Sequence, residues 1–244
     1  MCERYVLPDQ IAAEREFVPA TAWWKFSPRY NVAAQQYVPA IQWHDGQSEA
    51  IMMRWGLIPS WAEGEPVAAP PHSIASDRIE RSDLHRMPWL NAQRCILPVA
   101  GFYAWHLTSA KYRQPYFVRL IDRPVFALAA IWDRSGADEN VLESCSVITV
   151  PANGLVARIA DTALAMPAIL KRRDYATWLR GTAGEARAAL QPYGSEGMEA
   201  YAVSPRINST AADDAGLIRP AHRVRIVGST AVHAPSEAGQ SSAA

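Results

Sequence analysis

The chain contains few cysteines, no excess of charge and no long apolar run, and each absence narrows the class of protein. Its 244 residues include three cysteines, at positions 2, 95 and 145, which form neither a paired metal-ligand spacing nor an even-numbered disulfide framework. Such sparse usage suits a reducing cytoplasm. No run of about 18 apolar residues is free of charge, and no basic stretch precedes an apolar leader. We expect a cytoplasmic protein without a membrane partner.

Neither the net charge nor a phosphate-binding motif indicates a nucleic-acid partner. The 24 basic side chains are balanced by 24 acidic ones, so any nucleic acid would have to be held by a local cluster of cations. The sequence has no glycine-rich phosphate loop and no His-Glu-x-x-His motif. We therefore expect no metal and no cofactor. Cys95 and Cys145 lie in apolar segments, where cysteine usually acts as a small buried hydrophobe.

Short β-branched and aromatic segments dominate the chain. They predict strands at residues 3–7, 36–43, 49–55, 94–98, 101–107, 116–121, 125–131, 143–150 and 199–204. The turn at residues 44–46 predicts a hairpin, and Asp122-Arg123-Pro124 predicts a tight turn between two later strands. Helices are predicted at residues 11–16 after an Asp9 cap, at about 88–93 from Pro88, and at about 173–179 and 184–190.

The strands do not alternate regularly with helices, which favours an α+β fold. We expect one domain over residues 1–228, with a curled, barrel-like, mostly antiparallel β core and peripheral helices. Residues 63–71 carry Gly and Pro between alanines and predict an exposed loop. The Ala-, Ser- and Gly-rich tail at residues 229–244 predicts disorder.

Cys2 carries the strongest chemical indication. Removal of Met1 before a small residue would leave an α-amino group and a thiol on adjacent carbons, with ordinary pKa values of about 8 and about 8.5. The amine can then form a Schiff base with an aldehyde, and the sulfur can close a five-membered thiazolidine ring on the same carbon. The alternative is an ordinary thiol in a frayed terminus.

Several segments, in order, resemble the SRAP family, the SOS response-associated peptidase or abasic-site processing proteins. The matching segments are Met1-Cys2 with Arg4, Tyr30 to Ala33 with Gln36, Met53 to Ala62, Arg94 to Pro98, Gly101 to Tyr103 with Trp105, Gln114 to Phe117, Ala130 to Asp133, Met166 to Leu170, and Val203-Ser204 with Arg206. The run from Arg54 to Trp61 is the most specific of them. The resemblance covers residues 2 to about 220.

The resemblance implies a monomeric protein that binds single-stranded DNA. It implies capture of the open-chain aldehyde of an abasic site by Cys2 as a thiazolidine cross-link, and autoproteolytic release of Met1. It further implies DNA-binding roles for Arg4, Asn31, Arg54, Trp61, Ser76 and Arg78. For Trp61 the alternative is a ring packed under the Pro59 turn, and for Arg54 it is a pair with a local acid.

The chain departs from the family at several positions. Glu3 replaces the Gly after the catalytic Cys, Ser76 corresponds best to the family's Asn, and Ala104 replaces its catalytic Glu. The family has a His-Asp-Arg motif before its Met-Pro, and no such motif precedes Met166-Pro167 here. Asp161 lies nearby in the sequence, and Ala165 replaces the Arg. In the family, this Glu and this His carry protons during the reaction. A positioned group of that kind typically raises the rate about 100- to 10,000-fold.

His106 is one candidate replacement. Side chains two apart on a strand share a face, so we hypothesise that His106 partly stands in for the carboxylate absent at Ala104. Asp161 and Glu3 are weaker candidates, and the alternative is a surface histidine at a strand end. The late basic group of Arg219, His222, Arg223 and Arg225 is more typical of a solvated face.

Three functions remain open from the sequence. The first is abasic-site cross-linking through Cys2, with reduced activity because the family's Glu and His are absent. The second is a module that keeps the fold and binds DNA or another partner without the chemistry. The third is a peptidase acting on other proteins, ranked last because no Cys–His or Ser–His pairing is visible.

Overall fold

A tight turn sets the first hairpin in place, as predicted. The structure is a computed structural model that describes residues 3–62, 67, 69–109, 112–137, 140–160, 164–221 and 225–228. Asp45 and Gly46 both have positive φ, 47° and 79°, which suits a two-residue hairpin turn. They join β4 (Tyr37–His44) to β5 (Gln47–Trp55), with Tyr37 opposite Arg54 along the antiparallel pair.

The chain start also follows the prediction. β1 (Arg4–Leu7) is followed by α1 (Gln10–Phe17), and the Asp9 carboxylate accepts hydrogen bonds from the backbone N–H groups of Ile11 and Ala12 at 2.9 and 3.3 Å. That side chain satisfies N–H groups that have no partner within the first helical turn. β2 (Thr21–Ala22) and β3 (Arg29–Ala33) come next and were not predicted.

The remaining elements are mostly strands joined by short helices. In chain order they are η1 (Ser60–Ala62), β6 (Ser73–Ala75), η2 (Ile79–Arg81), α2 (Arg86–Leu90), β7 (Arg94–Val99), β8 (Gly101–Ser109), β9 (Tyr112–Leu120), β10 (Phe126–Ser135), β11 (Leu142–Pro151), α3 (Gly154–Ile159), β12 (Ala165–Pro167), β13 (Ile169–Leu170), η4 (Arg172–Asp174), α4 (Tyr175–Arg180), α5 (Ala183–Ala188), η5 (Ser195–Gly197), β14 (Met198–Ala202), η6 (Pro205–Asn208), η7 (Ala215–Ile218) and β15 (Arg225–Val227). α2 begins two residues before Pro88, whose missing N–H still falls in the first turn.

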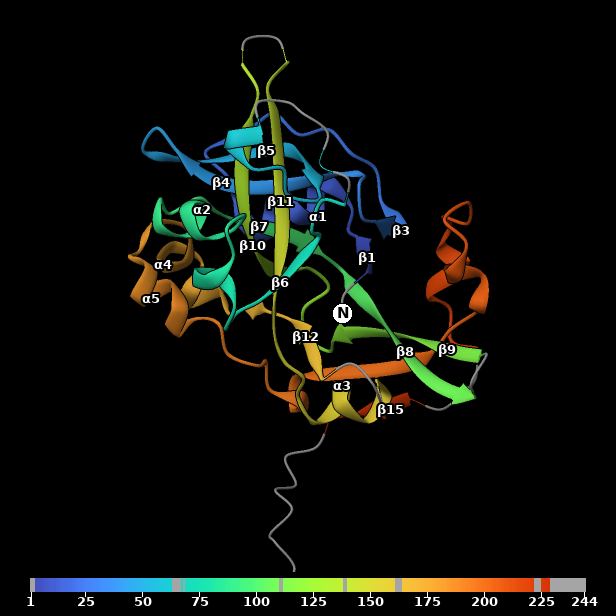
Figure 1. The fold of residues 1–244 in the computed structure, drawn as a ribbon. Helices are drawn as coiled ribbons and strands as arrows, with labels where there is room; N and C mark the ends of the chain where they lie inside the picture. The colour runs from blue at the N-terminus through green and yellow to red at the C-terminus, as the bar shows by residue number, and fades with distance from the viewer. Residues whose placement is uncertain are drawn as a thin grey trace, which may run out of the picture.

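Within the described residues the strands form two sheets. One has the order β15-β14-β9-β8-β1-β3, and the other runs β12-β11-β10-β7-β4-β5-β2. β11 also pairs with β5, through Ser144 opposite Arg54 and Cys145 opposite Trp55, so β5, β4, β7, β10 and β11 close into a ring. The α+β fold with a curled, mostly antiparallel core is confirmed (Figure 1).

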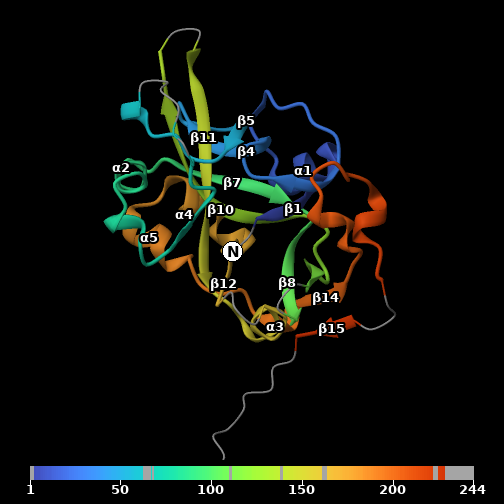
Figure 2. The same cartoon turned by 45° about the vertical axis from the view of Figure 1, so that its right-hand side comes forward.

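The predicted turn at residues 122–124 does not form a hairpin. Residues 122–124 connect β9 to β10, yet these strands belong to different sheets and do not pair. The turn therefore carries the chain from the smaller sheet to the barrel. Figure 2 shows β8 of the smaller sheet beside β1, below the barrel strands β7 and β10.

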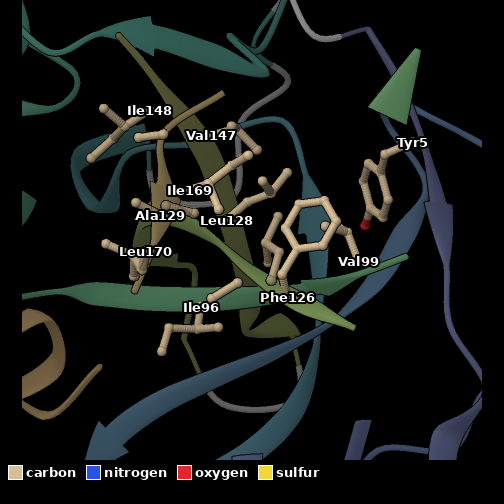
Figure 3. Close-up of a cluster of buried hydrophobic side chains, with 14 of the residues drawn as sticks. Tyr5, Ile96, Val99, Phe126, Leu128, Ala129, Val147, Ile148, Ile169 and Leu170 are labelled. Carbon is tan, nitrogen blue, oxygen red and sulfur yellow. The ribbon is translucent and has the colours of Figure 1, made fainter. Parts of the chain in front are cut away.

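The core fills the barrel and the space between the two sheets. Figure 3 shows Phe126, Leu128, Val99 and Tyr5 pointing toward a shared interior, and all four residues are fully buried. Cys95 and Cys145 are fully buried, as predicted. Among the described residues no helix is long and apolar enough to cross a membrane. The predicted tail at residues 229–244 lies outside the described residues, as does part of the predicted loop, at 63–66 and 68.

Candidate functional site at the start of β1

Cys2 lies outside the described residues, so the site is built from the residues around the strand that follows it. β1 is an interior strand with β3 on one side and β8 on the other. Arg4 lies opposite Ala33 on β3, and Tyr5 lies opposite both Val32 and Phe102. β1 therefore begins between these two strands.

The register of β1 and β8 locates Ala104 relative to the start of β1. The two strands are antiparallel, with Tyr5 opposite Phe102 and Val6 opposite Gly101. Ala104 therefore lies two residues beyond Phe102, in the direction of the chain start. Ala104 is only 8% exposed and belongs to the main core with Phe102. Its methyl group cannot carry a proton.

His106 lies further along the same face of β8. Its Nδ1–H donates to the carbonyl oxygen of Ile159, at the end of α3, over 3.0 Å. That bond fixes the tautomer and leaves Nε2 without a proton in the neutral ring. The half-buried ring is therefore anchored to α3 and is not a freely solvated histidine at a strand end. Its catalytic role stays a prediction.

A second histidine, His72, packs beside β1. The backbone carbonyl of His72 accepts hydrogen bonds from Trp55 Nε1 at 2.8 Å and from the N–H of Val147 at 2.9 Å, which fixes this residue between β5 and β11. The His72 ring meets the Trp55 indole edge-on at 5.9 Å. The same indole packs against Tyr5 of β1 at 5.0 Å. His72 is thus tied to β1 through one shared aromatic ring.

The His72 ring also interacts with the chain start. Burial lowers its pKa from the ordinary value of 6.5, while the Glu3 carboxylate partly opposes that shift by favouring the charged ring. His72 Nε2 is buried and accepts or donates no hydrogen bond among the residues that the structure describes. Because burial lowers the pKa of this half-buried imidazole, the neutral form of the ring is favoured at pH 7.

The turn between β3 and β4 holds Arg54 through the side chain of Gln35. Gln35 adopts a positive φ of 73°, and its side-chain oxygen accepts a hydrogen bond from Arg54 Nη2. The amide nitrogen of the same side chain donates to Pro70 O at 3.4 Å. Arg54 makes no ion pair with a described carboxylate, and its Nη1 is buried without a partner there. Among the described residues, Arg54 is therefore held by an amide, and a pair with a local acid stays a prediction.

Close packing explains the glycine that follows Trp55. Gly56 has a φ of 145°, and a Cβ there would lie 2.8 Å from the Gln35 amide nitrogen. Both conditions exclude larger side chains.

Asn31 is a buried residue of β3, 1% exposed. Its amide nitrogen donates to the carbonyl oxygens of Ser209 and Ala212, both at 2.8 Å, and of Ile207 at 3.3 Å. This side chain holds the segment after β14 against β3, two residues from the partner of Arg4. A direct contact between Asn31 and DNA stays a prediction.

Trp61 lies on the surface of η1, with 65% of the residue exposed. The backbone N–H of Ser60 donates to Asp133 Oδ2 at 2.8 Å, which anchors this short helix to β10. The ring is therefore not packed under the Pro59 turn. A fixed, exposed indole is available to stack on a flat group.

Ser76 and Arg78 lie at the far end of β6. Ala75 and Pro167 both lie opposite Thr149 of β11, and the N–H of Ser76 donates to Thr149 O at 2.8 Å. The Ser76 carbonyl accepts from Arg187 Nη1 at 3.3 Å, and Arg78 is exposed. Segments around residues 76, 149 and 167 therefore meet across β11, although no local pattern pairs them.

Comparison with known proteins decides the family. The profile of the SOS response associated peptidase (SRAP) family matches residues 1–210 of the chain. The chain belongs to the SRAP family. It is 33% identical over 190 residues to the abasic site processing protein YoqW of Bacillus subtilis, covering 76% of this chain and 83% of that one.

Other SRAP relatives and structures agree. The chain is 32% identical over 199 residues to the abasic site processing protein YoaM of Bacillus subtilis, covering 80% of this chain and 86% of the relative. It is 33% identical over 106 residues to the abasic site processing protein HMCES of Mus musculus, covering 38% and 30%. A crystal structure of a Bacteroides thetaiotaomicron protein superposes with a TM-score of 0.71 at 28% identity, covering 79% of this chain and 85% of that one.

Sequence reasoning about this SRAP chain missed His72 and its packing on Trp55. The only local signal was a histidine between the Arg54-to-Trp61 run and Ser76, directly after Pro70-Pro71. Among the other candidates, Asp161, His222 and Arg223 lie outside the described residues. Arg225 pairs with Glu199 at 3.4 Å and lies over the Tyr201 ring, in keeping with a solvated structural face.

Proposed function

We propose that this SRAP protein processes abasic sites by binding single-stranded DNA and bonding Cys2 covalently to the open-chain sugar. The observation that carries the proposal is the position of β1. The interior strand β1, which begins two residues after Cys2, lies between β3 and β8, and β8 carries Ala104 at the position of the family's Glu. An amine and a thiol on one residue, fixed in place, gain reactivity from proximity and orientation.

The chemistry needs no oxidant. The Cys2 amine adds to the aldehyde carbon to give a carbinolamine, whose hydroxyl leaves as water to form an iminium. The thiolate then bonds to the same carbon and closes the thiazolidine ring. The thiol proton and the departing hydroxyl balance, so the net by-product is one water molecule. The new carbon–sulfur bond replaces the hydrolysable carbon–nitrogen double bond of the iminium, which favours a durable adduct.

Cations and one exposed ring support binding of an unpaired strand. Arg4 begins β1, Arg54 lies on β5, and Arg78 is exposed after β6. We propose that they contact phosphates, and that the Trp61 indole stacks on an unpaired base. Because the chain has no net charge, this local group must supply the electrostatic attraction.

One gel tests the proposal. The protein without Met1 is incubated with a single-stranded oligonucleotide carrying one abasic site, and a covalent adduct that survives heat and denaturant is expected. Cys2→Ala should abolish the adduct, and Cys2→Ser should give only a labile imine, because an alkoxide-derived ring forms poorly. An oligonucleotide with an intact base is the matched control. An adduct that persists in Cys2→Ala would overturn the proposal.

A second candidate is a DNA-binding module without covalent chemistry. It is favoured by the buried methyl group of Ala104 at the family's Glu position. The same gel separates the two, because a module would retard abasic DNA in a native gel while giving no adduct under denaturing conditions.

A further inference from the structure

We propose that Tyr37 is a second base-stacking residue, and that Tyr37, Arg54 and Trp61 form one strip on the barrel surface that holds neighbouring nucleotides of a single strand. The inference rests on the proposed function, in which Arg54 contacts a phosphate and Trp61 stacks on a base. The new elements are Tyr37 and the order of the three side chains, with the arginine between the two rings.

Strand register sets the order of the strip. Tyr37 of β4 lies directly opposite Arg54 of β5, and Arg54 lies opposite Ser144 of β11. Asp133 of β10 lies opposite Ser144 in turn. Directly opposite residues project to the same face of a sheet, so the four positions form one row across four neighbouring strands. With strands about 4.8 Å apart, this row spans about 14 Å.

The row lies on the outer face of the barrel. Successive side chains of a strand point to opposite faces. Val38 and Met53, the neighbours of Tyr37 and Arg54 on their own strands, are fully buried. Tyr37 and Arg54 therefore point outward, and 57% of Tyr37 is exposed.

The segment after β5 folds over the other half of the row. The N–H of Ile58 donates to Ser144 Oγ at 2.8 Å, and the N–H of Ser60 donates to Asp133 Oδ2 at 2.8 Å. These contacts explain why Ser144 and Asp133 are buried although they lie on the outer face. They also fix η1, which begins at Ser60, beyond Arg54 in the row.

Arg54 therefore lies between two exposed rings, with Tyr37 on one side and Trp61 of η1 on the other. Gln35 holds the guanidinium in place, because its side-chain oxygen accepts from Arg54 Nη2. Arg54 makes no ion pair with a described carboxylate, so its positive charge remains available to a phosphate. A base on each side of one held phosphate is the arrangement that neighbouring nucleotides present.

The Tyr37 ring has open faces. Within the described part of the chain no aromatic ring pairs with it and no guanidinium lies over it, whereas Arg180 lies 4.7 Å from the centre of the Trp43 ring and Arg225 lies 5.4 Å from that of Tyr201. A ring with free faces can stack on any base. Its polar neighbour Arg54 suits a nucleotide better than an apolar protein partner.

The test measures fluorescence anisotropy with a labelled thymidine oligonucleotide that has no abasic site, so that covalent chemistry at Cys2 plays no part. Tyr37→Ala and Tyr37→Leu should each weaken binding about tenfold, within the range for one lost base stack. Tyr37→Phe, which keeps the ring, should restore the affinity. The salt slope should stay constant across the series, because no charge is removed.

Trp23→Ala is the matched control, since it removes an exposed ring that follows β2 and lies outside the strip. This variant should bind like the wild type. A double-mutant cycle then tests whether ring and arginine hold the same nucleotides. In Arg54→Met, adding Tyr37→Ala should weaken binding less than about threefold, because residues that share one ligand are not additive.

A direct contact gives a second readout. Irradiation of the complex with a thymidine oligonucleotide that carries 5-iodouracil should link the base to Tyr37, identified by mass spectrometry of the digested protein. A merely structural role for Tyr37 predicts no such link.

The outcomes are distinguishable. If the wild type does not bind the unmodified strand, the DNA-binding part of the proposed function fails and the strip fails with it. If the wild type binds and Tyr37→Ala and Tyr37→Leu keep its affinity, only the role of Tyr37 is overturned. An equal loss in Trp23→Ala, a loss in Tyr37→Phe as large as in Tyr37→Ala, or full additivity with Arg54→Met also overturns it. Failure of the covalent gel would leave this result standing.

Discussion

Two regions of the molecule use the same residue types in opposite ways. Beside α2 and α4, Arg94 is 1% exposed and lies between the Trp89 and Trp178 rings, 5.5 and 5.9 Å from their centroids. On β5 and η1, by contrast, Arg54 is half-buried with a described partner for only part of its guanidinium, and Trp61 is exposed. An arginine whose donors are all satisfied supports the fold, whereas one with spare donors can bind a ligand.

In the helical region, backbone carbonyl oxygens accept the hydrogen bonds of the Arg94 guanidinium. Arg94 Nε donates to Trp178 O at 2.6 Å, Nη1 to Trp89 O at 3.4 Å, and Nη2 to Gly181 O. Burial lowers the pKa of Arg94 from its ordinary value, but a guanidinium stays charged at neutral pH. Three carbonyls and two rings therefore replace a carboxylate partner.

Arg94→Met should produce the largest effect. It removes three hydrogen bonds that a buried, charged guanidinium donates to backbone carbonyls, so the free energy of unfolding should fall by about 3 kcal/mol or more. Urea unfolding followed by tryptophan fluorescence measures the change. Arg54→Met is the matched control and should cost less than about 1 kcal/mol. Equal losses in the two variants would break the comparison.

Glu16→Gln extends the comparison to an acid with a full set of partners. The Glu16 carboxylate accepts from Arg172 Nε at 2.9 Å, from Tyr175 at 3.2 Å and from Arg123. Burial acts to raise its pKa, but Arg172 and Arg123 outweigh burial and hold the pKa below 4.5. Near pH 7 the variant should lose about 2 kcal/mol of unfolding free energy, because hydrogen bonds to a charged group are lost.

The pH dependence of that loss follows from the direction of the shift. A lowered folded-state pKa contributes stability above pH 4.5, and this contribution disappears as the pH falls through the folded value. The wild type and Glu16→Gln should therefore converge in urea unfolding at low pH. A constant difference from neutral to acidic pH would contradict the assignment.

Arg54→Met should give the smallest change, and in binding alone. We expect single-stranded DNA affinity to fall about tenfold, with the slope of log affinity against log salt reduced by about 0.7, the value for one lost phosphate contact. Fluorescence anisotropy at several salt concentrations measures both. Arg225→Met, which removes an arginine already paired with Glu199, should leave the slope unchanged.

Local chemistry made part of the fold predictable. The Asp45-Gly46 turn and the Asp9 cap each depend on only a few neighbouring residues, so the hairpin and α1 could be predicted directly from the sequence. α3 was missed although its cap was visible: Asn153 Oδ1 accepts from the N–H of Val156 at 3.0 Å. The pairing of β11 with β5 joins residues 90 positions apart, and no local pattern identifies such a partner.

The candidate site divides in the same way. The resemblance located the motif residues, because family patterns are carried by sequence. The surroundings of β1 depend on register and on long-range packing, so neither the Tyr5–Phe102 pairing nor the packing of the His72 ring on Trp55 could be derived from spacing. A buried nitrogen without a partner is visible only in three dimensions.

The position of Cys2, two residues before β1, has a practical consequence for anyone preparing this protein. In the proposed chemistry, an affinity handle or fusion partner attached ahead of Cys2 would keep its amine in a peptide bond and prevent Schiff-base formation. β15 lies at the outer edge of its sheet, so a handle joined beyond Val227 does not involve that amine. Purification through the carboxyl end should preserve reactivity that an amino-terminal fusion would conceal.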